Sequence, residues 1–147
     1  MGMSTIVREV LGAECAEVIS LWHDAGLTRP WNDPETDFVR ATSGPSSTVL
    51  VCADAGALVG TVMVGHDGHR GWVYYLAVAQ SHRRRRVGRA LMDAAEKWLV
   101  EREVPKLQFM VRATNTPALG FYERLGYEDQ RCVVLGRRLD GVESHPE

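Results

Sequence analysis

Residues 74–98 constrain the fold most, because they join an apolar run to an amphipathic helix through a short basic loop. The run at 72–79 is almost continuously apolar and rich in aromatic and β-branched residues, which is typical of a strand buried on both faces. Beyond the loop, helical spacing predicts a helix with one buried face, formed by Val87, Ala90, Leu91, Ala94, Ala95, Trp98 and Leu99. The basic loop is therefore expected between the carboxyl end of a strand and the amino end of a helix.

A junction of this kind favours an anion. The first N–H groups of a helix lack intrahelical partners, and the helix dipole is positive at that end. Gly88 lets a ligand approach the backbone closely, and cationic donors come from Arg83, Arg84, Arg85 and Arg86. An arginine run alone is as often a solvated surface, but its position between strand and helix favours a diphosphate-binding loop.

The rest of the chain predicts further strands and helices. Asp54-Ala55-Gly56 separates two β-branched runs and is typical of a tight hairpin, so residues 49–79 are expected to form an antiparallel meander. The strand at 106–111 follows a helical crossover and should lie parallel to the one at 72–79. The expected elements are strands at 5–10, 47–53, 57–64, 72–79, 106–111 and 133–139, and helices at 12–25, 34–41, 87–99 and 116–125.

Composition limits the classes of function. The 147 residues, 45% hydrophobic and 24% charged, predict one globular domain over 1–147. A net charge of −2, with no aromatic residues interleaved among the arginines, argues against nucleic acid as a partner. No run reaches the roughly 18 apolar residues that span a bilayer, and residues 1–10 lack the apolar core of a signal peptide. With three scattered cysteines, these features predict a cytoplasmic protein with reduced thiols and no membrane partner.

Two loops contain further candidate residues. In 26–37, Asp33 precedes Pro34 and predicts a helix start, while Trp31 either contacts a substrate or closes the core over two helices. In 66–69, two histidines flank Asp67 and Gly68. Such a cluster is far more often a turn than a metal site, so no metal is expected.

Two motifs on either side of the long helix together resemble the GNAT superfamily of acyl-CoA-dependent N-acetyltransferases. The first, an Arg or Gln, two residues, Gly, one residue and Gly or Ala, falls on residues 83–88. The second, an Asn before a helix that ends in Tyr-Glu-x-x-Gly-aromatic, falls on residues 115–127. The resemblance covers nearly the whole chain. The chain is also similar to small bacterial YpeA-type acetyltransferases in four stretches, RPWNDPE, VGTVM, DGHRG and LGFYERLGY.

The resemblance implies a fold and a set of roles. The fold is α/β (α+β), with a mixed, mostly antiparallel central sheet, a parallel splayed pair of strands and about four helices. Acetyl-CoA would be the acyl donor and a primary amine the acceptor. Tyr122 would be the general acid, protonating the thiolate that leaves after direct attack by the amine. Cofactor contacts are implied for Leu76, Ala77, Val78, Arg83, Arg84, Arg85, Arg86, Val87, Gly88, Arg89 and Asn115.

The acceptor is expected at the loop before the second helix, through Trp31, Asn32, Asp33 and Glu35. Two departures from the family pattern matter: Arg86 stands where the motif has its first Gly, and Met110 stands where peptide-acetylating members often carry a carboxylate. The general base is left open between a water chain and Glu35, Asp33 or His66. A CoA-binding sensor without turnover is the alternative function, and a homodimer is a further possibility.

Overall fold

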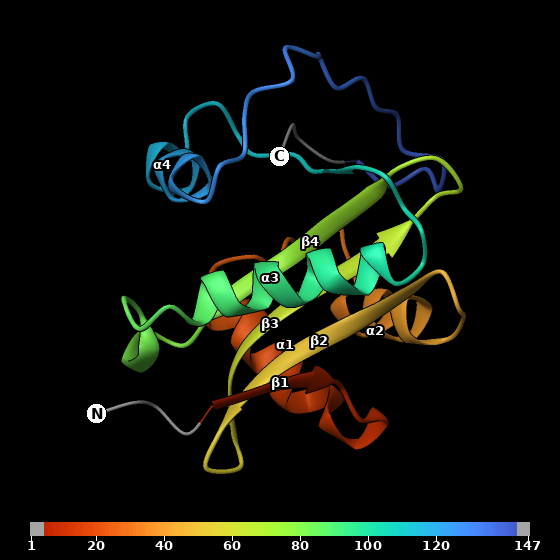
Figure 1. The fold of residues 1–147 in the computed structure, drawn as a ribbon. Helices are drawn as coiled ribbons and strands as arrows, with labels where there is room; N and C mark the ends of the chain where they lie inside the picture. Colours follow the sequence, from red (N-terminus) through yellow and green to blue (C-terminus); the bar gives the residue numbers. More distant parts are fainter. Residues whose placement is uncertain (1–4, 144–147) are drawn as a thin grey trace. The chain divides into compact units, whose positions relative to one another are not determined.

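The computed structural model describes residues 5–143 of the chain. It divides into two compact units, Met1–Phe109 and Met110–Glu147. The first unit contains the sheet and three α-helices, and the second contains one (Figure 1). The expectation of a single domain over 1–147 stays a prediction.

The first unit is built on a five-stranded sheet in the order β1-β2-β3-β4-β5. Neighbouring strands are antiparallel except β4 and β5, which are parallel, as predicted. In chain order the strands are β1 (Thr5–Glu9), β2 (Ser47–Asp54), β3 (Ala57–His66), β4 (Gly71–Val78) and β5 (Leu107–Gln108).

The hairpin between β2 and β3 follows from its turn residues. Ala55 (φ 50°) and Gly56 (φ 88°) are both left-handed, which matches the right-handed twist of the flanking strands. Asp54 pairs with Ala57 across this two-residue turn, so the predicted hairpin is confirmed.

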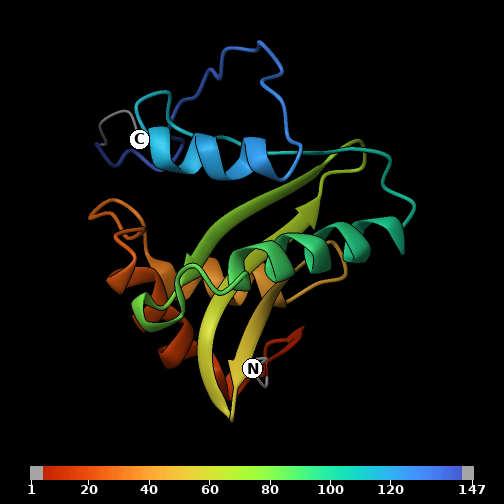
Figure 2. The same cartoon turned by 60° about the vertical axis from the view of Figure 1, so that its left-hand side comes forward.

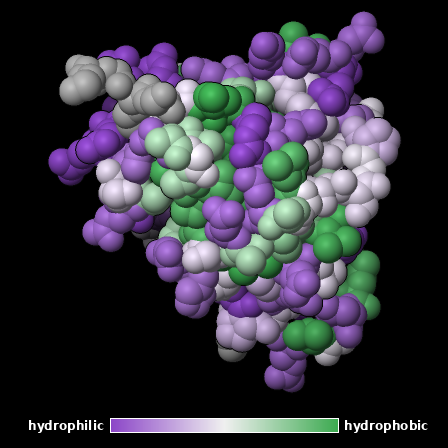
Figure 3. Space-filling model, turned by 90° about the horizontal axis from the view of Figure 1, so that it is seen from below, coloured by the Kyte–Doolittle hydropathy of each residue, from purple (hydrophilic) through white to green (hydrophobic). Residues whose placement is uncertain are grey.

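Helices cover both faces of the sheet: α1 (Cys15–Asp24) and α2 (Pro34–Thr42) lie on one face and α3 (Val87–Val100) on the other (Figures 1 and 2). Two short 3₁₀ turns, η1 (Gly12–Glu14) and η2 (Gln80–His82), precede α1 and α3. The core between α1, α2 and the sheet contains Val18, Trp22, Phe38, Ala41, Val49, Val51 and Ala77. Apolar residues are also present on the surface, where they gather near the middle of the face in Figure 3.

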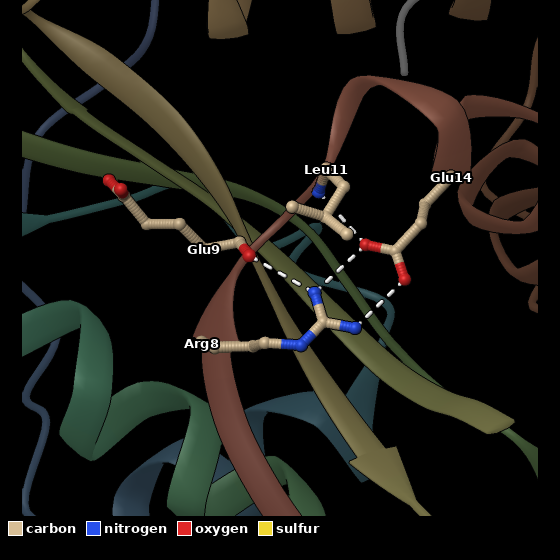
Figure 4. Close-up of polar contacts among 4 residues, drawn as sticks. All are labelled: Arg8, Glu9, Leu11 and Glu14. Atoms are coloured by element: carbon tan, nitrogen blue, oxygen red, sulfur yellow. Dashed lines mark hydrogen bonds and ion pairs between the residues drawn. The ribbon is translucent and has the colours of Figure 1, made fainter. Parts of the chain in front are cut away.

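A bidentate ion pair fixes the connection from β1 into η1. The Arg8 guanidinium donates to both carboxylate oxygens of Glu14, at 2.9 and 2.8 Å, and the Leu11 N–H donates to the same carboxylate at 2.8 Å (Figure 4). The hydrogen bonds from Arg8 lower the pKa of Glu14 to about 2. The carboxylate therefore stays charged over the physiological pH range.

The second unit contains α4 (Thr116–Arg124). The Asn115 side chain caps its start by accepting from the Ala118 N–H at 3.2 Å, and Pro117 lies in the first turn. Gly126 follows the helix in the left-handed conformation, with φ 94°. The predicted helix and both of its ends are confirmed.

Two predicted strands need correction. Residues 133–139 form no strand within the described chain, and Val133 and Leu135 are 85% and 90% exposed. A β-branched run becomes a strand only where its backbone groups find a partner, and periodicity does not supply one. The strand expected at 106–111 is limited to Leu107 and Gln108, so pairing with β4 stops after two residues. Over residues 5–143, no helix is both long and apolar enough to cross a membrane.

Candidate functional site

The basic loop lies where the sequence predicts it, between the end of β4 and the start of α3. Arg83, Arg84, Arg85 and Arg86 are all exposed. The Ala90 N–H donates to the Arg86 carbonyl at 3.0 Å and is the first intrahelical bond of α3. The N–H groups of Val87, Gly88 and Arg89 are thus the ones that a helix start leaves without intrahelical partners. Together they offer an anion a positive dipole end and several guanidinium groups.

Arg86 has the backbone conformation that glycine adopts most easily. Its φ is 62°, and it is the N-cap of α3 without a side-chain cap. For residues other than glycine this region costs about 1–2 kcal/mol. The left-handed backbone at this position therefore explains why the family motif has Gly there. The Arg86 side chain that replaces it is exposed. Arg84 shares the left-handed conformation, with φ 64°.

A hollow of about 330 Å³ adjoins this loop. It brings together two of the predicted cofactor residues, Val78 at the end of β4 and Arg83 in the loop. Its lining is completed by Leu21, Asp24, Ala25, Ala79 and Gln80. The carboxyl end of α1 therefore forms one wall of the candidate binding site.

An interaction that sequence reasoning missed anchors the loop to the β2–β3 hairpin. His82 Nε2 lies 2.7 Å from a carboxylate oxygen of Asp54, and Ser81 Oγ lies 2.8 Å from His82 Nδ1. Asp54 was identified only as a turn residue. His82 and Asp54 are 28 positions apart, so no local pattern connects them.

Strand β4 leaves one edge open at the hollow. Its parallel ladder with β5 comprises Gly71 with Leu107 and Trp72 with Gln108, and no further pair is present among residues 5–143. Leu76 and Val78, two of the predicted cofactor contacts, lie beyond the end of this ladder. The Ala77 side chain is buried in the core, so a ligand would meet only its backbone. The antiparallel register with β3 shifts between Thr61 and Met63, beside the left-handed Tyr75 (φ 54°).

The predicted residues of the second unit belong to α4: Asn115 is its N-cap and Tyr122 lies within it. Tyr122 is half-buried and makes edge-on ring contacts with Phe121 and Tyr127, with centroids 5.0 and 6.1 Å apart. Desolvation by burial raises the pKa of Tyr122 to about 12, so the phenol remains protonated at any physiological pH. Asn115 is exposed and uses its side-chain oxygen as the helix cap.

The loop candidates for the acceptor site have structural roles as well. Asp33 caps α2: its carboxylate accepts from the Glu35 N–H at 3.1 Å and from the Thr36 hydroxyl at 2.9 Å. The Thr36 hydroxyl lowers the pKa of Asp33, which makes this carboxylate a weaker base. Trp31 and Asn32 are half-buried and Glu35 is exposed.

The cluster at 66–69 is a turn, as favoured from sequence. Asp67 accepts from the N–H groups of His69 and Arg70, at 2.9 and 2.8 Å, and from the Trp72 indole at 2.8 Å. Across residues 5–143, no group of three or more His, Cys, Asp or Glu side chains is arranged to hold a metal ion.

Comparisons with known proteins agree with this geometry. The model of the acetyltransferase (GNAT) family matches residues 15–127. An acetyltransferase of Yersinia enterocolitica is 45% identical over 133 residues, covering 90% of this chain and 94% of the relative. A Yersinia pestis protein described as an uncharacterized N-acetyltransferase is 47% identical over 123 residues, covering 84% and 87%.

Solved structures show the same fold. The aminoglycoside N-acetyltransferase AAC(6')-Iy in complex with CoA has a TM-score of 0.82 at 15% identity, covering 95% of this chain and 97% of that one. Glucosamine-6-phosphate N-acetyltransferase from Arabidopsis thaliana has a TM-score of 0.72 at 17% identity, covering 93% and 99%. At these identities the likeness concerns the fold, whereas the family model and the Yersinia relatives cover most of the sequence. The chain therefore belongs to the acetyltransferase (GNAT) family.

Proposed function

We propose that the chain moves the acetyl group of acetyl-CoA to a primary amine, on a small molecule or an exposed side chain, by direct attack. Acetyl-CoA as donor and an amine as acceptor follow from the family. The observation that best supports the site is the meeting of two features at one hollow: the open end of β4, through Val78, and the arginine loop, through Arg83, which leads into the start of α3.

In this proposal the first unit holds the donor. The start of α3, from Val87 to Arg89, and the arginines 83–86 bind the diphosphate. The N–H groups of Leu76 and Val78, on the open edge of β4, hold the acetyl carbonyl and the pantetheine arm. Hydrogen bonds to the carbonyl oxygen polarise the thioester and stabilise the charge that develops there during attack.

The chemical step needs a nucleophile and an acid. The lone pair of the neutral amine attacks the acetyl carbon, the carbon–sulfur bond breaks, and the thiolate takes a proton from the Tyr122 phenol. The amine loses one proton to solvent, and the Tyr122 phenolate takes one proton from solvent, which restores the phenol. A pKa of about 12 keeps Tyr122 protonated and able to act as this acid.

The first experiment is thermal unfolding with and without acetyl-CoA, followed by turnover with a panel of amines. Donor at 100 times its dissociation constant should add about 2.7 kcal/mol to the free energy of unfolding. Because the similar solved structures are named for aminoglycosides and glucosamine-6-phosphate, the panel should include aminoglycosides and amino sugars. The absence of any stabilisation at millimolar acetyl-CoA would reject the proposed donor site.

Tyr122→Phe tests the acid. We expect kcat to fall roughly tenfold or more, because the leaving thiolate loses its proton donor. Tyr127→Phe is the matched control, since it removes a phenol hydroxyl from the same ring cluster and should leave kcat near the wild-type value. Because the pKa of Tyr122 is about 12, the rate should not fall through deprotonation of this group between pH 7 and 10. An unchanged kcat in Tyr122→Phe would remove the assignment.

A CoA-binding sensor is the second candidate, favoured by two observations. Arg86 occupies the glycine position of the motif, and Asp33, a candidate base, has a lowered pKa and serves as a helix cap. Tight binding of acetyl-CoA without turnover on any amine would support the sensor. The cytoplasmic location and the homodimer stay predictions.

A further inference from the structure

Tyr75 has the backbone conformation least expected of its residue type. Its φ is 54°, in the left-handed region, which bulky side chains rarely adopt. Such a strained backbone persists only where the surrounding structure holds it. At the same place the register of β4 with β3 shifts: Thr61 pairs with Ala77, whereas Met63 pairs with Tyr74. Tyr75 and Leu76 thus share the space opposite Val62, which defines a β-bulge.

Three contacts hold Tyr75. Its carbonyl accepts from the Thr61 hydroxyl at 3.0 Å, and its ring stacks on Trp22 with centroids 3.9 Å apart and planes 14° from parallel. Its own hydroxyl donates to a carboxylate oxygen of Asp37 at 2.6 Å. These anchors come from β3, α1 and α2, so the bulge is fixed by the surrounding elements and not by its own sequence.

The donor and acceptor roles of the Thr61 hydroxyl are fixed by its two hydrogen bonds. The Trp22 indole can only donate, and it donates to Thr61 Oγ1 at 3.0 Å. The Thr61 hydroxyl therefore accepts from Trp22 and gives its single proton to the Tyr75 carbonyl. Trp22 and Thr61 are both fully buried, so water cannot replace either bond.

We propose that Thr61 is a positioning residue for acetyl transfer, because its hydroxyl holds the bulge that aims the N–H groups of Leu76 and Val78. A bulge changes the direction in which the following residues of a strand present their backbone groups. Leu76 follows Tyr75 directly, on the edge of β4 that has no pair beyond Trp72 among the described residues. This inference rests on the proposed function, in which those N–H groups polarise the thioester carbonyl.

The test measures the thioester itself and needs no acceptor. The infrared band of the bound carbonyl is recorded with [1-¹³C]acetyl-CoA, because hydrogen bonds to a carbonyl oxygen lower its stretching frequency. Thr61→Val and Thr61→Ala both remove the hydroxyl, and Thr61→Ala serves if the valine variant fails to fold. Thr61→Ser keeps the hydroxyl and is the rescue control. Trp22→Phe removes the indole N–H, keeps an aromatic ring to stack on Tyr75 and leaves Thr61 free to donate to the Tyr75 carbonyl.

We expect the lowered band of the wild type to move back toward that of free acetyl-CoA in Thr61→Val and Thr61→Ala, and to stay lowered in Thr61→Ser and Trp22→Phe. On any amine that supports turnover, kcat of the hydroxyl-less variants should fall roughly ten- to hundredfold. Their dissociation constant for CoA should change far less than kcat, since the helix start that binds the diphosphate is untouched.

The outcomes separate the two proposals. A wild-type protein that does not bind acetyl-CoA refutes the proposed function. Binding with a lowered band that persists in Thr61→Val or Thr61→Ala leaves the function standing and refutes the role of Thr61. A band that reverts equally in Trp22→Phe and Thr61→Val also refutes it, because that result would indicate general damage to the core.

Discussion

Gly60→Ala tests how closely α3 must approach the sheet beneath the candidate site. Gly60 pairs with Val78 in β4 and faces the first turns of α3. An added Cβ would lie 2.8 Å from both Leu91 Cδ1 and Val87 Cγ1, and 3.2 Å from the Ala77 carbonyl oxygen. Carbon atoms in ordinary contact are about 3.5–4.0 Å apart, so the helix or the strand would have to move by about 0.7 Å or more.

The cost follows from which atoms can move. The Leu91 side chain can rotate, but Val87 is β-branched and has one strongly preferred rotamer in a helix. Overpacking of this kind costs about 1–3 kcal/mol, and each kcal/mol lowers the Tm of a domain this size by about 2–4 °C. We expect the Tm to fall by roughly 2–12 °C. Affinity for acetyl-CoA should fall as well, because Val87 begins the helix whose start binds the diphosphate.

The assay is thermal unfolding followed by circular dichroism, with calorimetric titration of CoA. Gly12→Ala is the matched control, because no atom lies within 4 Å of a Cβ at that position. Combining Gly60→Ala with Val87→Ala makes room for the new methyl group, so the double variant should lose less stability than the two single losses added. The reasoning is refuted if Gly60→Ala melts within about 1 °C of the wild type, or if the two losses simply add.

Two further substitutions probe backbone strain and charge. Arg86→Gly relieves the left-handed strain but gives the unfolded chain more freedom, so we expect a net gain of about 0.5–1 kcal/mol, seen as a higher Tm; a lower Tm would contradict this. Glu14 has its pKa lowered to about 2 by Arg8, so its contribution to stability is complete above pH 4.5 and is lost as the pH falls toward 2. Glu14→Gln should lower the Tm at pH 7 and weaken the dependence of the Tm on pH between 4.5 and 2. A pH dependence equal to that of the wild type would exclude the Arg8–Glu14 pair as its cause.

Local sequence patterns predicted most of the fold. Helical spacing from Val87 identified α3, the capping residue Asp33 identified the start of α2, and Ala55-Gly56 identified the hairpin turn. In each case the signal lies within a few residues of the structure that it predicts. The strand expected at 133–139 failed because strand formation depends on a partner, which periodicity cannot reveal.

The candidate site likewise contains features that the local sequence predicted and features that it did not. The position of the arginine loop between a strand and a helix was predictable, because both neighbouring elements have strong patterns. The left-handed conformation of Arg86 and the pairing of His82 with Asp54 were not. Arginine has no preference for a left-handed backbone, and the two paired side chains meet only after the sheet has formed.

By itself, the sequence determined the order of the elements as far as α4, the antiparallel meander, the parallel crossover and the place of the basic loop. Only the tertiary structure decided how β4 is shaped inside that frame. The bulge at Tyr75 depends on Trp22, Thr61 and Asp37, which are brought from three elements and are 14 to 53 positions away from it in the chain. Apolar periodicity reports which face of an element is buried, whereas a strained backbone is held by partners that only packing brings together.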